Sequence, residues 1–286
     1  MTQPAPAHAD TPVDLPRYLA RIGYDGPIAP TLEVLRELQA AHIAAIPFEA
    51  LDVLTGKGVE VDAASVDAKL IDRGRGGYCY EQNGLFLRVL RTIGFDAEAR
   101  LGRVRWMLAD DAPTTARSHM VSRVMLNGRP WLADVGFGAA APTAPLAMDD
   151  PDPQPTVHEA YRIRQSHAGE AGELLVEALL GDSWKAMYVF DDVPQQPIDI
   201  AVANWYTSTH PSSHFRHQLI VARADNAARY VLRDNRLTVR STDGRVEQSY
   251  LTADEIEASL GDLFLLPVRP HWRPAIARAA VMEIAA

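Results

Sequence analysis

The chain has 286 residues, of which 47% are hydrophobic and 23% are charged, and its formal net charge is −9. This length is ample for a large core and favours more than one domain. The acidic balance argues against nucleic acid as the main partner, and no apolar run approaches the roughly 20 residues of a membrane span. A single cysteine excludes an intramolecular disulfide and fits a reducing cytoplasm.

The amino-terminal part of the chain predicts a leader followed by helices. Residues 1–13 contain no Lys or Arg and no apolar run, so we expect a disordered leader and not a signal peptide. Residues 15–95 are helical in pattern, and Thr31 can cap a helix. The apolar residues of that helix are Leu32, Leu35 and Leu38.

The only cysteine, Cys79, stands in the sequence Arg-Gly-Gly-Tyr-Cys-Tyr-Glu-Gln-Asn at positions 75–83. This composition predicts a tight turn that runs into the first turn of a helix. The N–H groups of a first helical turn have no intrahelical partners and favour a thiolate over a thiol, so Cys79 is a candidate nucleophile. The alternative is a buried, inert thiol, because free cysteines are often core residues.

The pattern changes to short strands from position 97 to about 200. The expected strands are residues 99–107, 119–126, 131–135, 160–164, 174–180 and 184–190. Breaks between them are rich in proline and acidic residues, notably 142–155. Further strands are expected at 218–223, 229–233 and 237–241, before a helix that Thr252 and Glu255 open as a capping box and an alanine-rich helix at the end.

A predicted hairpin brings His119 and Asp134 together. Asn127-Gly128 is a strong signal for a two-residue loop, which makes Leu126 face Arg129. In that register Asp134 lies opposite the residue two positions beyond His119, so both side chains share one face of the sheet. Such diagonal neighbours are roughly 7–8 Å apart, within reach of an imidazole–carboxylate hydrogen bond. A three-residue loop would place them on opposite faces.

Cys79, His119 and Asp134 together predict a catalytic triad. His119 would take the thiol proton and later return one to a leaving group, while Asp134 would fix the imidazole tautomer and stabilise the imidazolium. Each of the two partners alone has an ordinary structural explanation, but the three together favour catalysis. The same triad attacks amides and thioesters generally, so the alternative enzyme is a cysteine hydrolase or a transglutaminase-like enzyme.

Other chemistries lack their motifs. There is no His-Glu-x-x-His, no cluster of Cys and His, and no nucleotide-binding glycine motif after a strand, so we expect no metal and no prosthetic group. His210, His214 and His217 surround a proline and two serines and are expected in a loop.

Four blocks of this sequence resemble the arylamine N-acetyltransferase family, in its bacterial type. They are residues 75–83, which resemble the family's active-site signature, residues 42–52, residues 118–120 with 131–138, and residues 204–215. Ala50 stands where the family pattern usually has Asn. The blocks cover nearly the whole chain in the family's order.

We therefore expect a mixed α/β protein in three parts. These are a helical bundle over residues 1–95 that carries Cys79, a β-barrel over 96–205 that carries His119 and Asp134, and an α/β lid over 206–286. The catalytic core would be like that of cysteine proteases and transglutaminases, with the active site between the first two parts.

The resemblance also implies a reaction. Acetyl-coenzyme A would acetylate Cys79, and the resulting thioester would pass the acetyl group to the nitrogen of an arylamine or arylhydrazine. The cleft for coenzyme A would lie near Ser118, Gly136, Phe137 and Gly138, with Phe48, Val104, Phe137 and Phe215 as apolar walls. Candidates for binding phosphates are Arg73, Arg75, Arg103 and Arg105. The enzyme would act in xenobiotic metabolism in the cytoplasm, as a monomer or homodimer.

Overall fold

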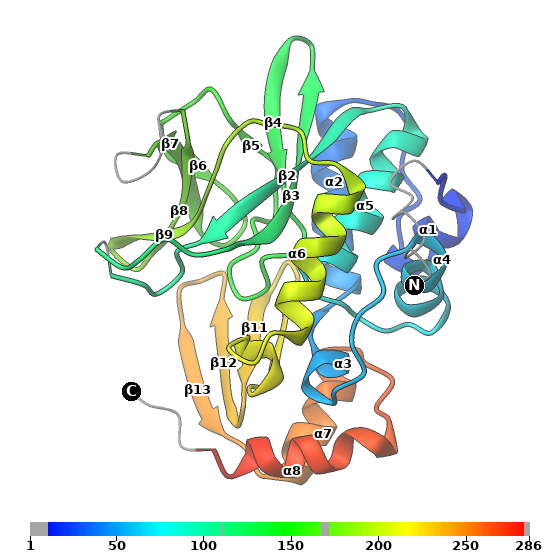
Figure 1. Ribbon diagram of the computed structural model, residues 1–286, viewed down its shortest axis with the longest axis vertical. Coiled ribbons are helices and arrows are strands. Elements are labelled where there is room, and N and C mark those ends of the chain that lie inside the picture. Colours follow the sequence, from blue (N-terminus) through cyan, green and yellow to red (C-terminus); the bar gives the residue numbers. More distant parts are fainter. Residues whose placement is uncertain (1–10, 110, 167–171, 283–286) are drawn as a thin grey trace.

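The structure, a computed structural model, describes residues 11–109, 111–166 and 172–282; most of the expected leader lies outside these ranges. The first part is helical as predicted (Figure 1). Its elements are α1 (Leu15–Ile22), α2 (Leu32–Ala45), the two-residue strand β1 (Phe48–Glu49), α3 (Leu51–Leu54), α4 (Ala63–Asp67), the π-helical turn η1 (Ala68–Asp72) and α5 (Cys79–Ile93). Thr31 caps α2, because its hydroxyl accepts the N–H of Val34 at 3.3 Å.

An eight-stranded antiparallel sheet follows, in the order β5-β4-β3-β2-β9-β8-β7-β6. Its strands are β2 (Asp96–Val104), β3 (Arg117–Leu126), β4 (Arg129–Ala133), β5 (Leu146–Ala147), β6 (Gln154–Pro155), β7 (Ala160–Gln165), β8 (Leu174–Leu180) and β9 (Ser183–Phe190). The sheet curls into a nearly closed barrel. Its two edges are linked by Gln154, whose side-chain amide accepts the N–H of Ala147 at 2.7 Å and donates to its carbonyl at 2.9 Å.

The hairpin between β3 and β4 has the predicted register. Leu126 faces Arg129, and Ser122 faces Ala133. Asn127 and Gly128 both have positive φ, at 51° and 78°, as a type I′ turn requires. This register confirms that His119 and Asp134 come to one side of the hairpin.

A second, five-stranded antiparallel sheet has the order β1-β10-β11-β12-β13. Its remaining strands are β10 (Ile220–Ala224), β11 (Ala228–Arg233), β12 (Arg236–Ser241) and β13 (Val246–Tyr250). The helices α7 (Ala253–Asp262) and α8 (Arg273–Ala280) pack below it around the buried Trp272 (Figure 1). The predicted capping box opens α7, since the carboxylate of Glu255 accepts the N–H of Thr252 at 2.8 Å.

Several expectations about elements are wrong in detail. The expected strand at 99–107 is β2 (Asp96–Val104), which begins three residues earlier and ends sooner, because a turn at residues 106–107 with Met107 at φ 59° follows the last bond to β9, from the N–H of Arg105 to the carbonyl of Met187. The break at 142–155 contains β5 and β6. Other elements were not expected: the short strand β1 within the part predicted to be helical, β13, whose five residues are all exposed, and the helix α6 (Pro197–Thr209). None of the helices in the described parts of the chain is long and apolar enough to cross a membrane.

Candidate active site

Cys79 is the first residue of α5, as the sequence predicts. The turn before it needs its glycines for close approach to neighbouring groups. A Cβ atom on Gly76 would lie 2.1 Å from the carbonyl oxygen of Pro47, and one on Gly77 would lie 2.7 Å from Oε2 of Glu81. The same Oε2 accepts the N–H of Tyr78 at 3.1 Å, which fixes the residue before Cys79.

The three residues of the predicted triad lie together. Nε2 of His119 is 2.8 Å from Oδ2 of Asp134, and the other side of the imidazole has the thiol of Cys79 as a hydrogen-bond partner. Sγ of Cys79 also lies 3.6 Å from the carbonyl oxygen of Ser118. All three triad side chains are buried. With Nε2 taken by the carboxylate, Nδ1 is the ring nitrogen left to exchange a proton with the thiol.

Asp134 is held by four donors. Its carboxylate accepts hydrogen bonds from Nε2 of His119, from Oη of Tyr188 at 3.0 Å, from Nδ2 of Asn83 at 3.0 Å and from the N–H of Gly136 at 2.8 Å. Burial raises the pKa of Asp134, but His119, Asn83 and the Gly136 N–H lower it more, so the net pKa is below its ordinary value. Asp134 is therefore a carboxylate at neutral pH.

Two of these residues were missed from the sequence. Asn83 lies four residues after Cys79, so it shares the face of α5 that carries the thiol, and this spacing is a signal that could have identified it. Its side chain also donates to the carbonyl of Met120 at 2.6 Å and accepts the N–H of Val135 at 2.9 Å. Tyr188 comes from β9, and no motif around it indicates its role.

Charge and burial oppose each other at His119. Burial lowers its pKa, but the charge and hydrogen bond of Asp134, together with Cys79, raise it to about 10. The imidazolium therefore persists at neutral pH beside the side chain of Cys79.

This raised pKa predicts a pH dependence of stability. His119 binds its proton more tightly in the folded chain than in the unfolded one, where its pKa is about 6.5. The resulting stabilisation is complete below pH 6.5 and is lost as pH rises through about 10. In urea unfolding at a series of pH values from 7 to 10, the free-energy difference between the wild type and His119→Gln should shrink as pH rises. A difference that does not change with pH would contradict the protonated imidazole.

The glycine-rich segment after Asp134 lies directly against Cys79. A Cβ atom on Gly136 would be 2.6 Å from Nδ2 of Asn83 and 2.8 Å from Cα of Cys79, so the position accepts only glycine without rearrangement. Gly138 has φ +73°, and a Cβ there would lie 3.1 Å from the ring of Phe48. Both expected site glycines therefore border the triad or its aromatic surroundings.

Of the residues expected as apolar walls, Phe137 contacts the triad directly, and the others lie among its neighbours. The ring of Phe137 meets His119 edge to face with centroids 5.1 Å apart, and it also contacts Tyr188 and Trp106. Phe215 packs between Phe48 and Tyr78, at 6.0 and 5.8 Å. Val104 is the strand partner of Tyr188, whose own ring contacts His119 at 4.7 Å. Trp106 was not predicted for this site.

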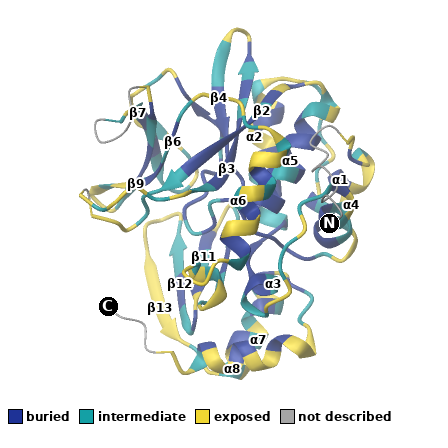
Figure 2. Ribbon diagram, viewed as in Figure 1, coloured by how far each residue is buried: buried dark blue, intermediate teal, exposed yellow. Residues whose placement is uncertain are grey.

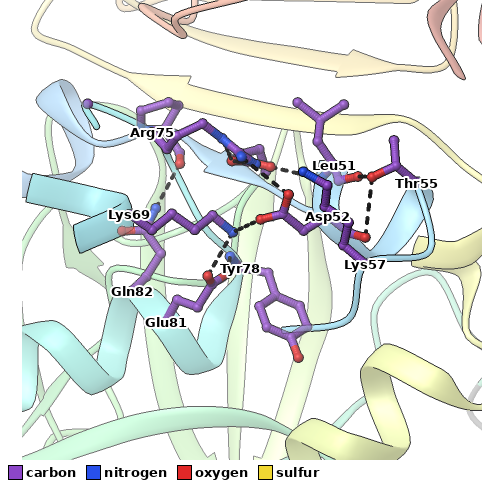
Figure 3. A network of polar contacts seen from close by, with 12 residues as sticks. Leu51, Asp52, Thr55, Lys57, Lys69, Arg75, Tyr78, Glu81 and Gln82 are labelled. Atoms are coloured by element: carbon purple, nitrogen blue, oxygen red, sulfur yellow. Dashed lines mark hydrogen bonds and ion pairs between the residues drawn. The ribbon is translucent and has the colours of Figure 1, made fainter. Parts of the chain in front are cut away.

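Beneath the turn that carries Cys79 lies a buried network of charges (Figure 3). Nζ of Lys69 binds Oε1 of Glu81 at 2.7 Å and Oδ2 of Asp52 at 2.8 Å. Arg75 binds Oε1 of Glu49 at 2.7 Å and Oδ1 of Asp52 at 3.2 Å. The network thus has two cations and three carboxylates, and burial together with Glu49 raises the pKa of Glu81 despite Lys69. It supports the Cys79 turn from below, through Glu81.

The contacts of this network explain why Ala50 is tolerated at the start of α3 and where the side chain of Arg75 lies. Ala50 has no side chain to cap α3, but Oε2 of Glu49 accepts the N–H of Leu51 at 2.8 Å in its place. Arg75 is buried against these carboxylates and the ring of Trp272, so its guanidinium is committed inside the protein and does not bind phosphates. Arg73 is exposed on the wall of a cleft of about 790 Å³ that borders the network and that no triad residue lines.

Removing the ammonium of Lys69 is expected to destabilise the fold strongly. Lys69→Met leaves the buried carboxylate of Glu81 without its cation, while the half-buried Asp52 keeps Arg75, and breaking a buried pair in this way costs about 3–5 kcal/mol. Urea unfolding measures the loss. Adding Glu81→Gln to Lys69→Met should recover part of it, and Lys185→Met at an exposed position should change the free energy of unfolding by less than about 0.5 kcal/mol. A loss below 1 kcal/mol for Lys69→Met would show that the network does not depend on this cation.

No group of three or more His, Cys, Asp or Glu side chains is placed to hold a metal ion in the part of the chain that the structure describes. His210 and His217 lie in the exposed segment after α6, and His214 begins a short 3₁₀ turn there (His214–Arg216), so these three histidines do not form a cluster of ligands.

Comparisons with known proteins all indicate one family. A family model described as N-acetyltransferase matches residues 31–273. An arylamine N-acetyltransferase of Mycolicibacterium smegmatis is 44% identical over 230 residues, which are 79% of this chain and 82% of that protein. The solved structure of a Mycobacterium marinum arylamine N-acetyltransferase matches with a TM-score of 0.88 at 39% identity, covering 93% of this chain and all of that one. The M. marinum protein solved in complex with CoA matches with a TM-score of 0.87 at 40% identity, over 93% of this chain and 98% of that one.

Proposed function

Because this chain belongs to the arylamine N-acetyltransferase family, we propose that it transfers an acetyl group from acetyl-coenzyme A to the nitrogen of an arylamine or arylhydrazine. The observation that carries the proposal is the buried array of Cys79, His119 and Asp134, with 2.8 Å between the imidazole and the carboxylate. The relative solved with CoA supports the identity of the acetyl donor.

The first half of the proposed reaction attaches the acetyl group to Cys79. His119 is protonated in the resting site and holds the proton that Cys79 has given up, and the Cys79 thiolate attacks the carbonyl carbon of the acetyl thioester. The tetrahedral intermediate collapses, the bond from carbon to the sulfur of coenzyme A breaks, and His119 returns the proton to that leaving thiolate. The products are free coenzyme A and an acetyl thioester on Cys79. Asp134 stabilises the imidazolium through both steps.

The second half of the proposed reaction transfers the acetyl group from Cys79 to the amine. The amine nitrogen attacks the carbonyl carbon of the Cys79 thioester, and His119 takes a proton from that nitrogen. The carbon–sulfur bond to Cys79 breaks, leaving a neutral amide and the thiolate beside the imidazolium. Electrons and protons balance over the two halves without any further reactant. The enzyme therefore needs no metal or prosthetic group for this chemistry.

The same proposal includes the binding sites. Ser118, Gly136, Phe137 and Gly138 would border coenzyme A, and Phe48, Val104, Phe137 and Phe215 would border the acceptor. In support, Phe137 presents its ring directly beside the imidazole of His119, where a flat aromatic amine can lie against it. Because Gly136 carries no side chain, the segment after Asp134 packs directly against Cys79, so a donor bound along this segment would lie close to the thiol.

We also propose the three-part layout expected from the sequence, with a protease-like catalytic core. Its support is that Cys79 comes from a helix of residues 1–95, while His119 and Asp134 come from the strands of residues 96–205. The remaining residues form most of the second sheet and its two helices. Residues 205 and 206, at the proposed boundary, both lie within α6.

Mass spectrometry of the intact protein and its Cys79 peptide tests the reaction. Incubation with acetyl-coenzyme A should add one acetyl group to that peptide, and an aniline or hydrazine should then remove it with formation of the acetylated amine. A cysteine hydrolase would instead lose the acetyl group to water equally fast without an amine. A binding protein with an inert thiol would gain no acetyl group, and its iodoacetamide rate would not change in His119→Ala.

A further inference from the structure

The cleft of about 790 Å³ beside the buried charge network is separate from the triad, since no triad residue lines it. Its walls come from two distant parts of the chain: residues between 52 and 81, and Arg269 and His271 near the short turn η3 (Pro270–Trp272). Figure 2 shows the segment between α3 and α4, residues 55–62, only in the colours of exposed and intermediate residues. The cleft is therefore open to solvent, and its size is that of a small-molecule site, about 300–1,000 Å³.

The mouth of this cleft carries cations that no carboxylate neutralises. Lys57, Arg73 and Arg269 are exposed and line it, and none of them forms an ion pair with a residue that the structure describes. Exposed arginines elsewhere do have carboxylate partners, such as Arg129, whose Nε lies 2.6 Å from Oδ1 of Asp149. Three unpaired cations thus share one cleft in a chain whose net charge is −9.

A contact between the two walls adds a further donor. Nζ of Lys57 lies 3.3 Å from Nε2 of His271, which is 214 positions later in the chain. An ammonium can only donate, so Nε2 of His271 accepts this hydrogen bond and its Nδ1–H remains available. Lys57 and His271 therefore bring donors from the first and the last part of the chain to the same place.

The inner end of the cleft is the charge network (Figure 3). Lys69, Arg75 and Glu81 are the buried residues that line it, and carboxylates of the network already pair with both cations. Among the lining residues, Glu60 is the only carboxylate without a partner. A cationic ligand would thus meet three like charges at the mouth, and an apolar ligand would find few apolar groups there, chiefly Val59. The charges favour an anionic ligand.

We propose that this cleft binds an oligophosphate group, either free or as part of a nucleotide, in contact with Lys57, Arg73 and Arg269. A guanidinium presents parallel N–H donors that match the oxygens of a phosphate, and a cleft with protein walls strengthens the attraction. Two or three linked phosphates carry enough charge to neutralise all three cations, whereas one carboxylate does not. The bound group joins residues 57–73 to residues 269–271. The proposal is independent of the acetyl-transfer chemistry, because no triad residue lines the cleft.

Isothermal titration calorimetry with inorganic triphosphate, at low ionic strength and without divalent cations, tests the site. Arg73→Gln and Arg269→Gln should each raise the Kd at least about tenfold, because each removes a charge-assisted hydrogen bond. Glu60→Gln should lower the Kd, since it removes the one unpaired carboxylate. Arg278→Gln, at an exposed position of α8 outside the cleft, is the matched control and should leave the Kd unchanged. No binding to the wild type, or an unchanged Kd in both Arg73→Gln and Arg269→Gln, would overturn the proposal.

Thermal unfolding gives a second measurement. The Tm of the wild type should rise with triphosphate concentration, and less so in Arg73→Gln and Arg269→Gln. Without triphosphate the two variants should unfold at the temperature of the wild type, because both side chains are exposed and have no carboxylate partner among the described residues. A rise of the same size with sulfate at equal ionic strength would overturn the proposal.

Parallel titrations with ATP and with adenosine identify the source of the phosphates. Tighter binding of ATP than of triphosphate would support a nucleotide as the ligand, and equal binding would support the phosphate chain alone. Adenosine that binds as tightly as ATP would overturn the proposal, because the cations of the cleft would then contribute nothing.

Discussion

Replacing Cys79 by alanine is expected to lower kcat/KM for acetyl transfer by about 10⁶-fold, because removal of a nucleophile leaves only the binding contributions of the site. His119, whose pKa is raised to about 10, and the carboxylate of Asp134 that binds it both act on the sulfur of Cys79 in the proposed reaction. Without that sulfur, neither residue can promote the transfer. Steady-state kinetics with acetyl-coenzyme A and an aniline measure the loss.

A control separates chemistry from folding in this experiment. The Cys79 side chain is small, so Cys79→Ala should change the free energy of unfolding by only about 1–2 kcal/mol, as other small core truncations do. Cys79→Ser keeps the size of the side chain and should lose nearly as much activity. A Cys79→Ala variant that folds and retains more than a hundredth of the activity would show that another group is the nucleophile.

Asp134→Asn is expected to lower kcat/KM by about 10⁴-fold, in line with the loss of the orienting carboxylate in other triads. The side chain of Asp134 faces four donors, so an asparagine must point its own amide donor at one of them. The pKa of His119 should fall toward its ordinary value, because Asp134 is the main group that raises it. The pH dependence of kcat/KM and an NMR titration of the imidazole measure both effects.

Tyr188→Phe is the matched control for this prediction. It removes one neutral donor from the Asp134 carboxylate and leaves the charge, so the loss should stay below about tenfold. A loss as large as that of Asp134→Asn would mean that the hydroxyl of Tyr188 takes part in the reaction. An Asp134→Asn variant with an unchanged His119 pKa would mean that the carboxylate does not control the imidazole.

The triad could be predicted from the sequence because each of its elements has a local signal. The Asn127-Gly128 turn fixes the register of β3 and β4, and the register fixes which side chains share a face. The two glycines before Cys79 mark a close-packed turn whose only continuation is a helix. Each of these signals lies in a few neighbouring residues. The turn and the start of the helix can therefore be predicted without knowledge of distant contacts.

The rest of the site depends on contacts that the sequence does not encode locally. Tyr188 reaches Asp134 only because the barrel curls and brings β9 beside β2. The partners of Lys69 are 17 positions before it and 12 after it, in segments whose charges look like ordinary surface. The helix α6 was not predicted because its apolar side faces solvent. The order of its apolar and polar residues therefore does not indicate which side is buried.

The hydrogen bonds of Asn83 imply an order in which the parts of the site assemble. Its amide joins α5 to Met120 in β3 and to Asp134 and Val135 after β4, so it has these partners only when the hairpin is in place. A ribosome makes the chain from its amino end, and residue 79 therefore emerges well before residues 119–135. Until that later segment folds against α5, the thiol has no base and no carboxylate. The nascent chain carries Cys79 without its partners, and folding brings the imidazole and the carboxylate to it.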